Sequence, residues 1–405
     1  VRTRDVRRSL FRSLSVLGWT RRRGSDGEEG SWKIATALGV GFERRRFSDV
    51  GGEIGLGAQD ADDRALRVHG RIAGQWSPTP WFGVATMIAA ETSEFDPDDP
   101  LAPAPIGAST RQAAQGGLEL RWSPRIAHLR TEIRPSARME VVSSRTQDIR
   151  PGAAGAERST TTVAPTFRLG ALVELARGLA LVGSLASGMR VPHLREFFGD
   201  RGFVVGNPNL SPERSLSGDF GVSARTHTRP LSLTLDARGF VTRIDDLIRY
   251  TLNDQFQALP ENVGRADLYG VEVRGVLSGP GPLRLTTAVT WIEAQDRSLD
   301  RRLPLRPRLE TFVKPELDLG SLGPLDGFVL FSEGTYVSSN FADAANLVIL
   351  PSRFLWDLGT RLDWSRHYSL ALVVRNLLDV RVQDTLGYPL PGLAAFATLN
   401  VRTSL

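Results

Sequence analysis

Apolar and polar side chains alternate with a period of two along most of this chain, and no other feature limits its fold as strongly. From Trp32 to Phe42 every second residue is Trp, Ile, Thr, Leu, Val or Phe, and the residues between them are Lys, Ala or Gly. The stretches 66–76, 231–241 and 353–364 alternate in a similar way. Because side chains of a strand point alternately to the two faces of a sheet, each stretch has one apolar and one polar face. The sequence therefore predicts an all-β fold.

The connections between these stretches favour a membrane barrel over a soluble β-sandwich, whose strands alternate in the same way. A barrel that crosses a membrane has tight turns at one rim and long loops at the other. Short connections are expected near 77–80, 123–126, 175–178, 227–230, 279–282, 320–325 and 365–367, and long ones near 44–63, 94–110, 143–159, 191–213, 244–261, 295–306, 339–351 and 381–391. This regular alternation of short and long connections predicts an antiparallel transmembrane β-barrel with about 16–17 strands. We expect residues 1–30 to form an N-terminal segment with a partial strand at Arg8–Thr20, and residues 31–405 to form the barrel.

Tryptophans mark the ends of several predicted strands. Trp76, Trp122 and Trp364 each stand directly before a short connection. Tryptophan prefers the boundary between membrane and water, so the repetition predicts an aromatic girdle at one rim. The alternative is that these rings fill the core of a soluble protein. A transmembrane helix is not expected, because no run of about 18 to 20 uncharged apolar residues occurs.

The amino-acid composition argues against several kinds of functional site. The chain contains no cysteine, which excludes disulfides and thiolate catalysis. Its formal net charge of +5 suits a polyanionic partner, but the arginines are spread along the chain and nucleic acid is not expected. The five histidines have no metal-ligand spacing.

Motifs for catalysis and for cofactors are not found either. No nucleophile elbow, phosphate-binding loop or dinucleotide-binding motif lies between a strand pattern and a helix pattern. The acidic residues Asp96, Asp98 and Asp99 are more typical of a solvated turn than of a calcium site. We therefore expect no catalytic residue, no metal and no cofactor, and we do not expect an enzyme.

Three motifs follow one another in the second half of the chain. Gly188–Ser215 contains Arg-x-Pro, then Glu-Phe-Phe-Gly, and then Gly-Asn-Pro-Asn-Leu-Ser-Pro-Glu. Residues 262–272 contain Asn-x-x-x-Ala-x-x-x-Gly-x-Glu, and residues 376–392 begin with Asn-Leu-Leu-Asp and end with Gly-Tyr-Pro-Leu-Pro-Gly. In this order and at this spacing, the motifs resemble those of TonB-dependent outer-membrane receptors.

The matching positions cover the region from residue 180 onward, and the strand pattern extends the resemblance to about residue 30. They are Arg190, Pro192, Glu196, Phe198, Gly199, Gly206, Asn207, Pro208, Leu210, Pro212, Glu213, Asn262, Ala266, Gly270, Glu272, Asn376, Leu377, Asp379, Gly387, Pro389, Pro391 and Gly392. Two places depart from the family pattern. Arg381 and Val382 stand where an aromatic residue is usual, and Leu393 stands where arginine is common.

Most of the motif residues are expected to shape the barrel and its loops rather than to bind a ligand. Gly206–Pro208 suits a tight turn, because Gly and Asn tolerate positive φ and Pro fixes its own. Arg190 and Glu272 are expected to face the lumen, where a plug domain could pair with them. Ligand contacts are assigned only to a long loop, with Tyr250 and Phe256 as the candidates.

The resemblance implies import of a scarce nutrient, such as a ferric siderophore or cobalamin, through the outer membrane of a Gram-negative bacterium. Receptors of this family hold a plug domain inside a barrel of about 22 strands. No plug-like segment occurs here, so we expect this chain to be the C-terminal barrel portion, either as a fragment or because the reading frame begins too late. A natural variant without a plug is the third alternative. The implied partners are the TonB–ExbB–ExbD complex, a small chelate ligand, and outer-membrane lipid and lipopolysaccharide. We expect a monomer.

Two other functions stay open. A passive porin of about 16 strands fits the strand number and the missing plug. A binding or adhesion barrel, or a remnant without transport activity, fits the loop lengths equally well.

Overall fold

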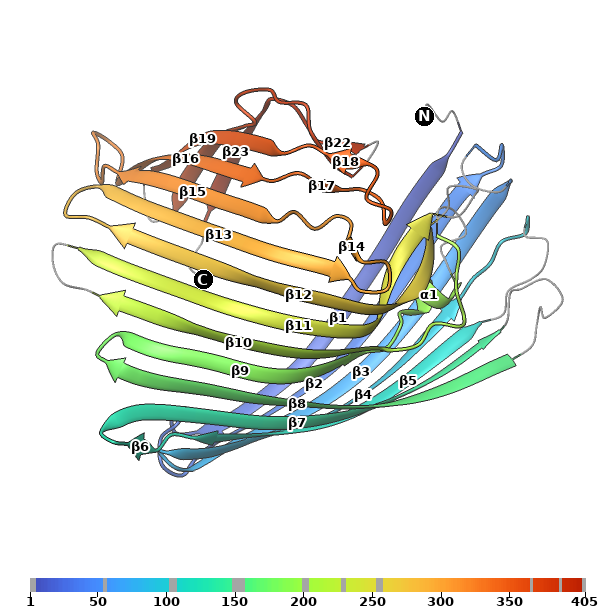
Figure 1. The fold of residues 1–405 in the computed structure, drawn as a ribbon, viewed down its shortest axis with the longest axis horizontal. Coiled ribbons are helices and arrows are strands. Elements are labelled where there is room, and N and C mark those ends of the chain that lie inside the picture. The colour runs from blue at the N-terminus through green and yellow to red at the C-terminus, as the bar shows by residue number, and fades with distance from the viewer. Residues whose placement is uncertain are drawn as a thin grey trace. The chain divides into compact units, whose positions relative to one another are not determined.

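The computed structural model describes residues 5–53, 57–101, 108–147, 157–198, 204–226, 231–252, 258–364, 367–385 and 388–402. This part of the chain holds one five-residue helix, α1 (Leu194–Phe198), and is otherwise made of strands and their connections (Figure 1). The long strands are β1 (Arg7–Arg23), β2 (Ser31–Asp49), β3 (Gln59–Thr79), β4 (Phe82–Asp96), β5 (Ser109–Trp122), β7 (Leu129–Gln147), β8 (Glu157–Ala176), β9 (Leu179–Arg190), β10 (Glu213–Thr226), β11 (Ser232–Leu252), β12 (Ala258–Ser278), β13 (Leu283–Asp296), β15 (Leu309–Asp318), β16 (Gly327–Val337), β19 (Arg353–Asp363), β20 (Tyr368–Arg375) and β23 (Ala394–Val401). The short strands are β6 (Arg125–Ile126), β14 (Arg301–Arg302), β17 (Asn340–Phe341), β18 (Ile349–Leu350), β21 (Gln383–Thr385) and β22 (Tyr388–Pro389).

The long strands belong to one sheet, in which successive strands pair side by side and the pairs are antiparallel. Over the described residues the sheet has 19 strands, and leaving out the two-residue strands β6 and β14 gives 17 long ones. The predicted all-β antiparallel fold is confirmed, as is the expected number of about 16–17 strands. The stretch expected to be a partial strand at Arg8–Thr20 lies within β1, which pairs with β2 over its whole length.

The strands run further toward the long-loop rim than the sequence pattern predicts. The connections expected near 44–63 and 244–261 are largely strand, because β2, β3, β11 and β12 extend into them. The guanidinium groups of Arg44 and Arg46 both hydrogen-bond to the carboxylate of Asp62 on the neighbouring strand. Cross-strand pairs of opposite charge stabilise a ladder beyond its apolar stretch. The predicted loop placement is therefore wrong for these residues.

Large apolar side chains lie on the exposed face of the strands, which reverses the arrangement of a soluble protein. Ile72 on β3 is 60% exposed, and Ile88, directly opposite it on β4, is 68% exposed. The other face of the same strands carries Asp63 and Ser93, which are 7% and 8% exposed. A barrel with lipid outside and a polar lumen has this distribution.

The three tryptophans that end strands are exposed as well. Trp76 is 54% exposed, Trp122 is 44% exposed and Trp364 is 39% exposed. The ring of Trp364 stacks on Tyr368, with 6.1 Å between the centroids. The alternative that these tryptophans fill a core is therefore wrong, and their exposure supports an aromatic girdle.

The chain divides into two compact units. The first comprises Val1–Ala171, Leu185–Leu216 and Ile244–Gly264, and the second comprises Leu172–Ser184, Ser217–Arg243 and Arg265–Leu405. Among the described residues, no helix has the length and apolar character needed to cross a membrane.

A carboxylate outside the spanning strands of the second unit makes the stability depend on pH. Asp343, between β17 and β18, accepts hydrogen bonds from the backbone N–H groups of Val348 (2.7 Å) and Leu347 (3.0 Å). Burial raises the pKa of Asp343, but these N–H donors outweigh burial and hold the pKa below its ordinary value. The charged form is therefore the stabilising one.

We expect the stabilisation by Asp343 to be complete above the ordinary pKa of an aspartate and to be lost as the pH falls through the lowered value. The wild-type protein and D343N are expected to differ in free energy of unfolding near neutral pH and to converge as the pH falls below the ordinary pKa of an aspartate, about 4. Urea titrations in detergent micelles at a series of pH values measure this difference. A difference that is constant over the whole pH range contradicts the assignment.

Candidate functional site

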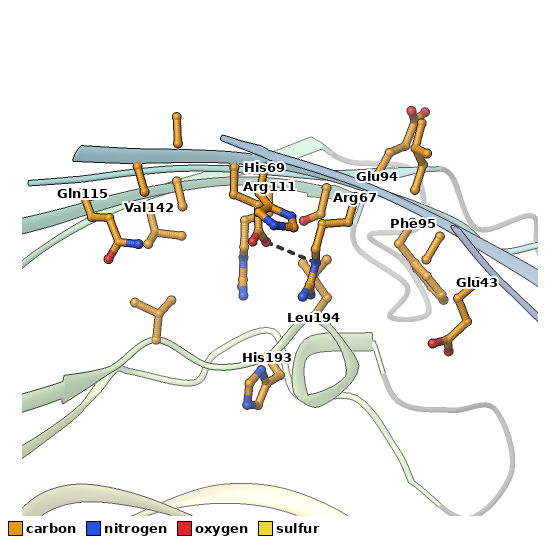
Figure 2. Close-up of a pocket in the computed structure, with 18 of the residues that line it drawn as sticks. Glu43, Arg67, His69, Glu94, Phe95, Arg111, Gln115, Val142, His193 and Leu194 are labelled. Carbon is orange, nitrogen blue, oxygen red and sulfur yellow. Dashed lines mark ion pairs between the residues drawn. The ribbon is translucent and has the colours of Figure 1, made fainter. Parts of the chain in front are cut away.

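A cavity of about 830 Å³ lies in the first unit, between the polar face of β2–β5 and β7 and the segment that follows β9. Figure 2 shows Arg67, His69 and Arg111 pointing from the sheet toward His193 and Leu194 on that segment. The imidazole ring of His69 lies over Gly39, where a Cβ atom would collide with the ring in this conformation. The alternation of the strands thus places charged side chains in one enclosed space.

The cavity lining is densely charged, with more arginines than carboxylates. Arg67 pairs with Glu91 at 3.3 Å, and the dashed line at Arg67 in Figure 2 marks this ion pair. The lining holds seven arginines, two histidines and five carboxylates, namely Arg45, Arg64, Arg67, Arg71, Arg111, Arg190, Arg195, His69, His193, Glu43, Asp63, Glu91, Glu94 and Glu140.

Arg190 is fixed by two carboxylates of the first motif. Its guanidinium donates to Glu213 at 2.7 and 2.8 Å and to Glu196 at 2.9 and 3.1 Å. Glu196 is only 5% exposed, and its carboxylate also accepts the backbone N–H of His193 at the start of α1. Glu213 accepts the backbone N–H of Ile248 as well. Arg190 is therefore engaged within its own motif.

Arg111 connects β5 to the segment after β9. Its Nη2 donates to the carbonyl oxygen of Pro192 at 2.7 Å, and its Nε donates to the hydroxyl of Ser144 at 3.0 Å. Its guanidinium carbon also lies 5.9 Å from the ring centroid of Phe197. These contacts hold the segment over the polar face of β5 and β7, where it closes one side of the cavity.

The structure brings the first motif and the start of the second together. The side chain of Asn207 donates to the carbonyl oxygen of Pro260 at 2.9 Å. The backbone N–H of Asn207 donates to the backbone carbonyl oxygen of Glu196 at 2.8 Å. Asn262 accepts the backbone N–H of Ser211 at 2.8 Å and donates to the carbonyl oxygens of Ser211 and Asp246. The motif asparagines thus act as bridges between backbone segments.

Removing the Asn262 bridge is expected to loosen residues 206–211 without unfolding the barrel. In N262A the amide of Ser211 loses its acceptor, which costs about 1–2 kcal/mol of local stability. Hydrogen exchange is expected to show faster exchange of the Ser211 amide, while the amides of β3 and β4 stay protected. N400A, at an exposed position of β23, serves as the control. Equal protection of Ser211 in both variants contradicts the bridging role.

Other matched residues of the first two motifs shape the backbone. Pro192 is almost completely buried, Leu210 is 8% exposed and Ala266 is 0% exposed. A Cβ atom on Gly270 would collide with the carbonyl oxygen of Trp291. The first motif also contributes Phe198, the last residue of α1, together with Gly206, Pro208 and Pro212 in the segment after it.

The third motif forms a compact loop in the second unit. Asn376 is 4% exposed and has a φ of 49°, and its backbone N–H donates to Asp357 at 2.8 Å. Its side chain donates to the carbonyl oxygens of Val380 and Pro391. Asp379 accepts the backbone N–H of Leu393 at 2.9 Å. Leu377, Pro389 and Gly392 belong to the same loop region, and these contacts are structural.

Several sequence-predicted residues lie elsewhere. Glu272 is exposed on β12 in the second unit. Tyr250 lies on β11, is 47% exposed and is not among the residues that line the cavity. Gly199, Gly387 and Phe256 lie outside the described residues. Within the described part of the chain, no group of three or more His, Asp or Glu side chains is placed to hold a metal ion.

Residues 5–377 match the family model described as "TonB dependent receptor-like, beta-barrel". The chain belongs to this family.

Solved structures share the fold of this receptor barrel at low sequence identity. The copper transporter OprC has a TM-score of 0.78 at 17% identity, and the match covers 96% of this chain and 64% of that one. The ferric yersiniabactin uptake receptor FyuA from Yersinia pestis has a TM-score of 0.65 at 17% identity, covering 96% and 60%. The iron transporter FrpB from Neisseria meningitidis (F5-1 variant) has a TM-score of 0.71 at 13% identity, covering 97% and 64%. The receptor barrel spans less than two thirds of the length of these proteins.

The motifs of the receptor family point to Arg190, Glu196 and Glu213, but sequence reasoning misses most of the cavity. Arg67, Arg111 and His69 carry no motif. The only sequence feature that marks them is a position on the polar face of a strand, and many other charged residues have the same feature.

Proposed function

We propose that the full-length protein that contains this chain imports a scarce nutrient through the outer membrane of a Gram-negative bacterium, with energy supplied through TonB. Family membership over residues 5–377 carries this proposal. The names of the structural relatives, which refer to copper, iron and ferric yersiniabactin, favour a metal or a metal chelate as cargo. The proposed partners are the TonB–ExbB–ExbD complex and outer-membrane lipid. The proposed membrane domain is residues 31–405, acting as a monomer.

The cavity supports a polar or charged small ligand. Its volume of about 830 Å³ falls within the roughly 300–1,000 Å³ typical of small-molecule sites. Seven arginines and five carboxylates line it, and the lining Arg190 pairs with two further carboxylates, Glu196 and Glu213, so side chains of both charges can contact a ligand. A ferric siderophore, which carries ionised and polar groups, is the first choice of ligand, and cobalamin is the second.

Uptake by whole cells tests the proposal. Cells without receptors for the test ligands would express the full-length protein and be given radiolabelled iron in a panel of ferric siderophores, or radiolabelled cobalamin. We expect accumulation of at least one ligand, and no accumulation in a matched strain that lacks TonB. Equal accumulation with and without TonB contradicts active import.

A passive porin is a second candidate, because one observation favours it. The segment after β9 is held over the polar face of the sheet by Arg111 and Pro192, as a constriction loop would be. Single-channel conductance of the full-length protein in a planar bilayer separates the two functions. A steady open conductance supports the porin, and a closed baseline supports the receptor.

A further inference from the structure

A cluster of arginines lies where the β12–β13 ladder reaches the long-loop end of β13, on the face that carries exposed apolar side chains. Directly opposite residues in this pair share a face, and the register sets Val271 opposite Trp291 and Tyr269 opposite Glu293. The ladder continues to Arg265, whose carbonyl oxygen accepts the backbone N–H of Arg297. We call this group the rim cluster, and its members are Arg243, Arg265, Asp267, Glu293, Arg297, Arg302 and Arg308.

Two poorly exposed carboxylates organise the rim cluster. The side chain of Asp267 is 16% exposed and pairs with Arg297 at 2.9 Å, Arg265 at 3.3 Å and Arg243 at 3.6 Å. The side chain of Glu293 is 5% exposed and pairs with Arg308 at 2.6 Å and with Arg302 at 3.6 Å. Each carboxylate therefore holds several guanidinium groups in one place.

The carboxylates do not balance the charge of the arginines. Five arginines share two carboxylates, which leaves three positive charges in the rim cluster. The side chains of Arg243, Arg297 and Arg308 are 43–54% exposed, so their free N–H groups can reach a ligand. Beyond the end of β13, burial lowers the pKa of Arg302, and the charge of Arg308 lowers it further. The guanidinium groups are thus crowded, and a bound anion would relieve their repulsion.

An aromatic pair fixes the height of the rim cluster relative to the membrane. The rings of Tyr269 and Trp291 meet edge to face with 6.0 Å between centroids, and the two residues are 40% and 42% exposed. Val271, opposite Trp291, is 46% exposed. Exposed Tyr and Trp mark the boundary between apolar membrane and water. The rim cluster begins one step beyond this pair along the ladder of β12 and β13, so in an outer membrane it would lie at the level of the lipid head groups.

We propose that the rim cluster binds the phosphate group of an anionic outer-membrane lipid while the lipid's acyl chains cover the apolar face below. Arginine pairs with phosphate through two parallel hydrogen bonds, and exposed guanidinium groups held side by side suit such a ligand. The proposal rests on the membrane location of the barrel and is independent of the nutrient that it transports.

The test uses the full-length protein in mixed detergent micelles that contain lipid A with both phosphates. Binding would be titrated for the wild-type protein, for R265Q/R297Q and for the control R284Q, which removes an exposed arginine at the other end of β13. We expect R265Q/R297Q to bind lipid A at least about tenfold more weakly, because two charge-assisted contacts are lost, and R284Q to bind like the wild-type. R265K/R297K keeps the charge but not the paired hydrogen bonds of a guanidinium group, and is expected to bind lipid A with an affinity between those of R265Q/R297Q and the wild-type. Circular dichroism of all the variants checks that the barrel is folded.

Two further binding measurements show whether the phosphate that the rim cluster binds belongs to a lipid or is free in solution. Lipid A without phosphates, but with the same acyl chains, is expected to bind as weakly to the wild-type protein as lipid A binds to R265Q/R297Q. Inorganic phosphate at millimolar concentration is expected not to displace lipid A. Equal binding of the two lipids, full affinity of R265Q/R297Q, or displacement by inorganic phosphate would each overturn the proposal. TonB-dependent uptake is measured separately, so its failure is distinguishable from this one.

Discussion

Replacing Arg190 by alanine is expected to lower the free energy of unfolding by about 3 kcal/mol. The substitution leaves the carboxylates of Glu196 and Glu213 without their shared partner, and their side chains are only 6% and 14% exposed. Removing one member of a buried ion pair costs about 3–5 kcal/mol, and the lower end applies here because Arg190 itself is 35% exposed. Urea unfolding and refolding in detergent micelles measures the change.

The control for this prediction is R125Q in β6, which removes the same charge at an exposed position. It is expected to change the free energy of unfolding by less than about 0.5 kcal/mol. The double variant R190M/E196Q is expected to be more stable than R190A, because it leaves only one carboxylate without Arg190. If R190A and R125Q were equally stable, the hydrogen bonds around Arg190 would not stabilise the fold.

Replacing Gly270 by alanine is expected to cost about 2 kcal/mol, through overpacking rather than loss of a contact. A Cβ atom at residue 270 would collide with the carbonyl oxygen of Trp291 and lie 2.8 Å from Cζ of Phe240. The carbonyl is part of the β12–β13 ladder, so relief requires movement of the backbone itself. Thermal unfolding in micelles measures the loss.

Gly279 provides a matched control in the connection at the other end of the same two strands. A Cβ atom there would meet nothing within 4 Å. G279A is therefore expected to keep the wild-type unfolding temperature or to raise it slightly, because alanine reduces the entropy of the unfolded chain. A similar loss in G279A and G270A would show that the cost comes from removing glycine and not from the collision.

The fold could be predicted from the sequence because its main signal is local. Alternation along a single strand, as from Trp32 to Phe42, identifies the strand and its two faces without knowledge of the partner strand. The ends of the strands could not be predicted in this way. Arg44 and Asp62 lie in the extended parts of β2 and β3, where they pair with each other, although in the sequence they resemble a charged loop.

The candidate site could be predicted only where motifs mark it. The motifs identify Arg190, Glu213 and Asn262, but not the contacts that they make. Glu213 meets Arg190, and Ser211 meets Asn262, only once the segment after β9 has folded. Arg111 is one of 50 basic residues, and nothing in its local sequence distinguishes it. Its role comes from the register that sets it near Ser144 and Pro192.

Site-specific labelling tests most directly whether the apolar face contacts lipid and the charged face lines an aqueous lumen. The chain has no native cysteine, so single cysteines at Ile88 and at Gln115 can be compared in the full-length protein in lipid vesicles. Ile88 faces outward on β4, and Gln115 lines the cavity from β5. We expect a water-soluble maleimide to label I88C slowly and Q115C rapidly, with both labelled fully after unfolding. Rapid labelling of I88C together with protection of Q115C would contradict the transmembrane barrel.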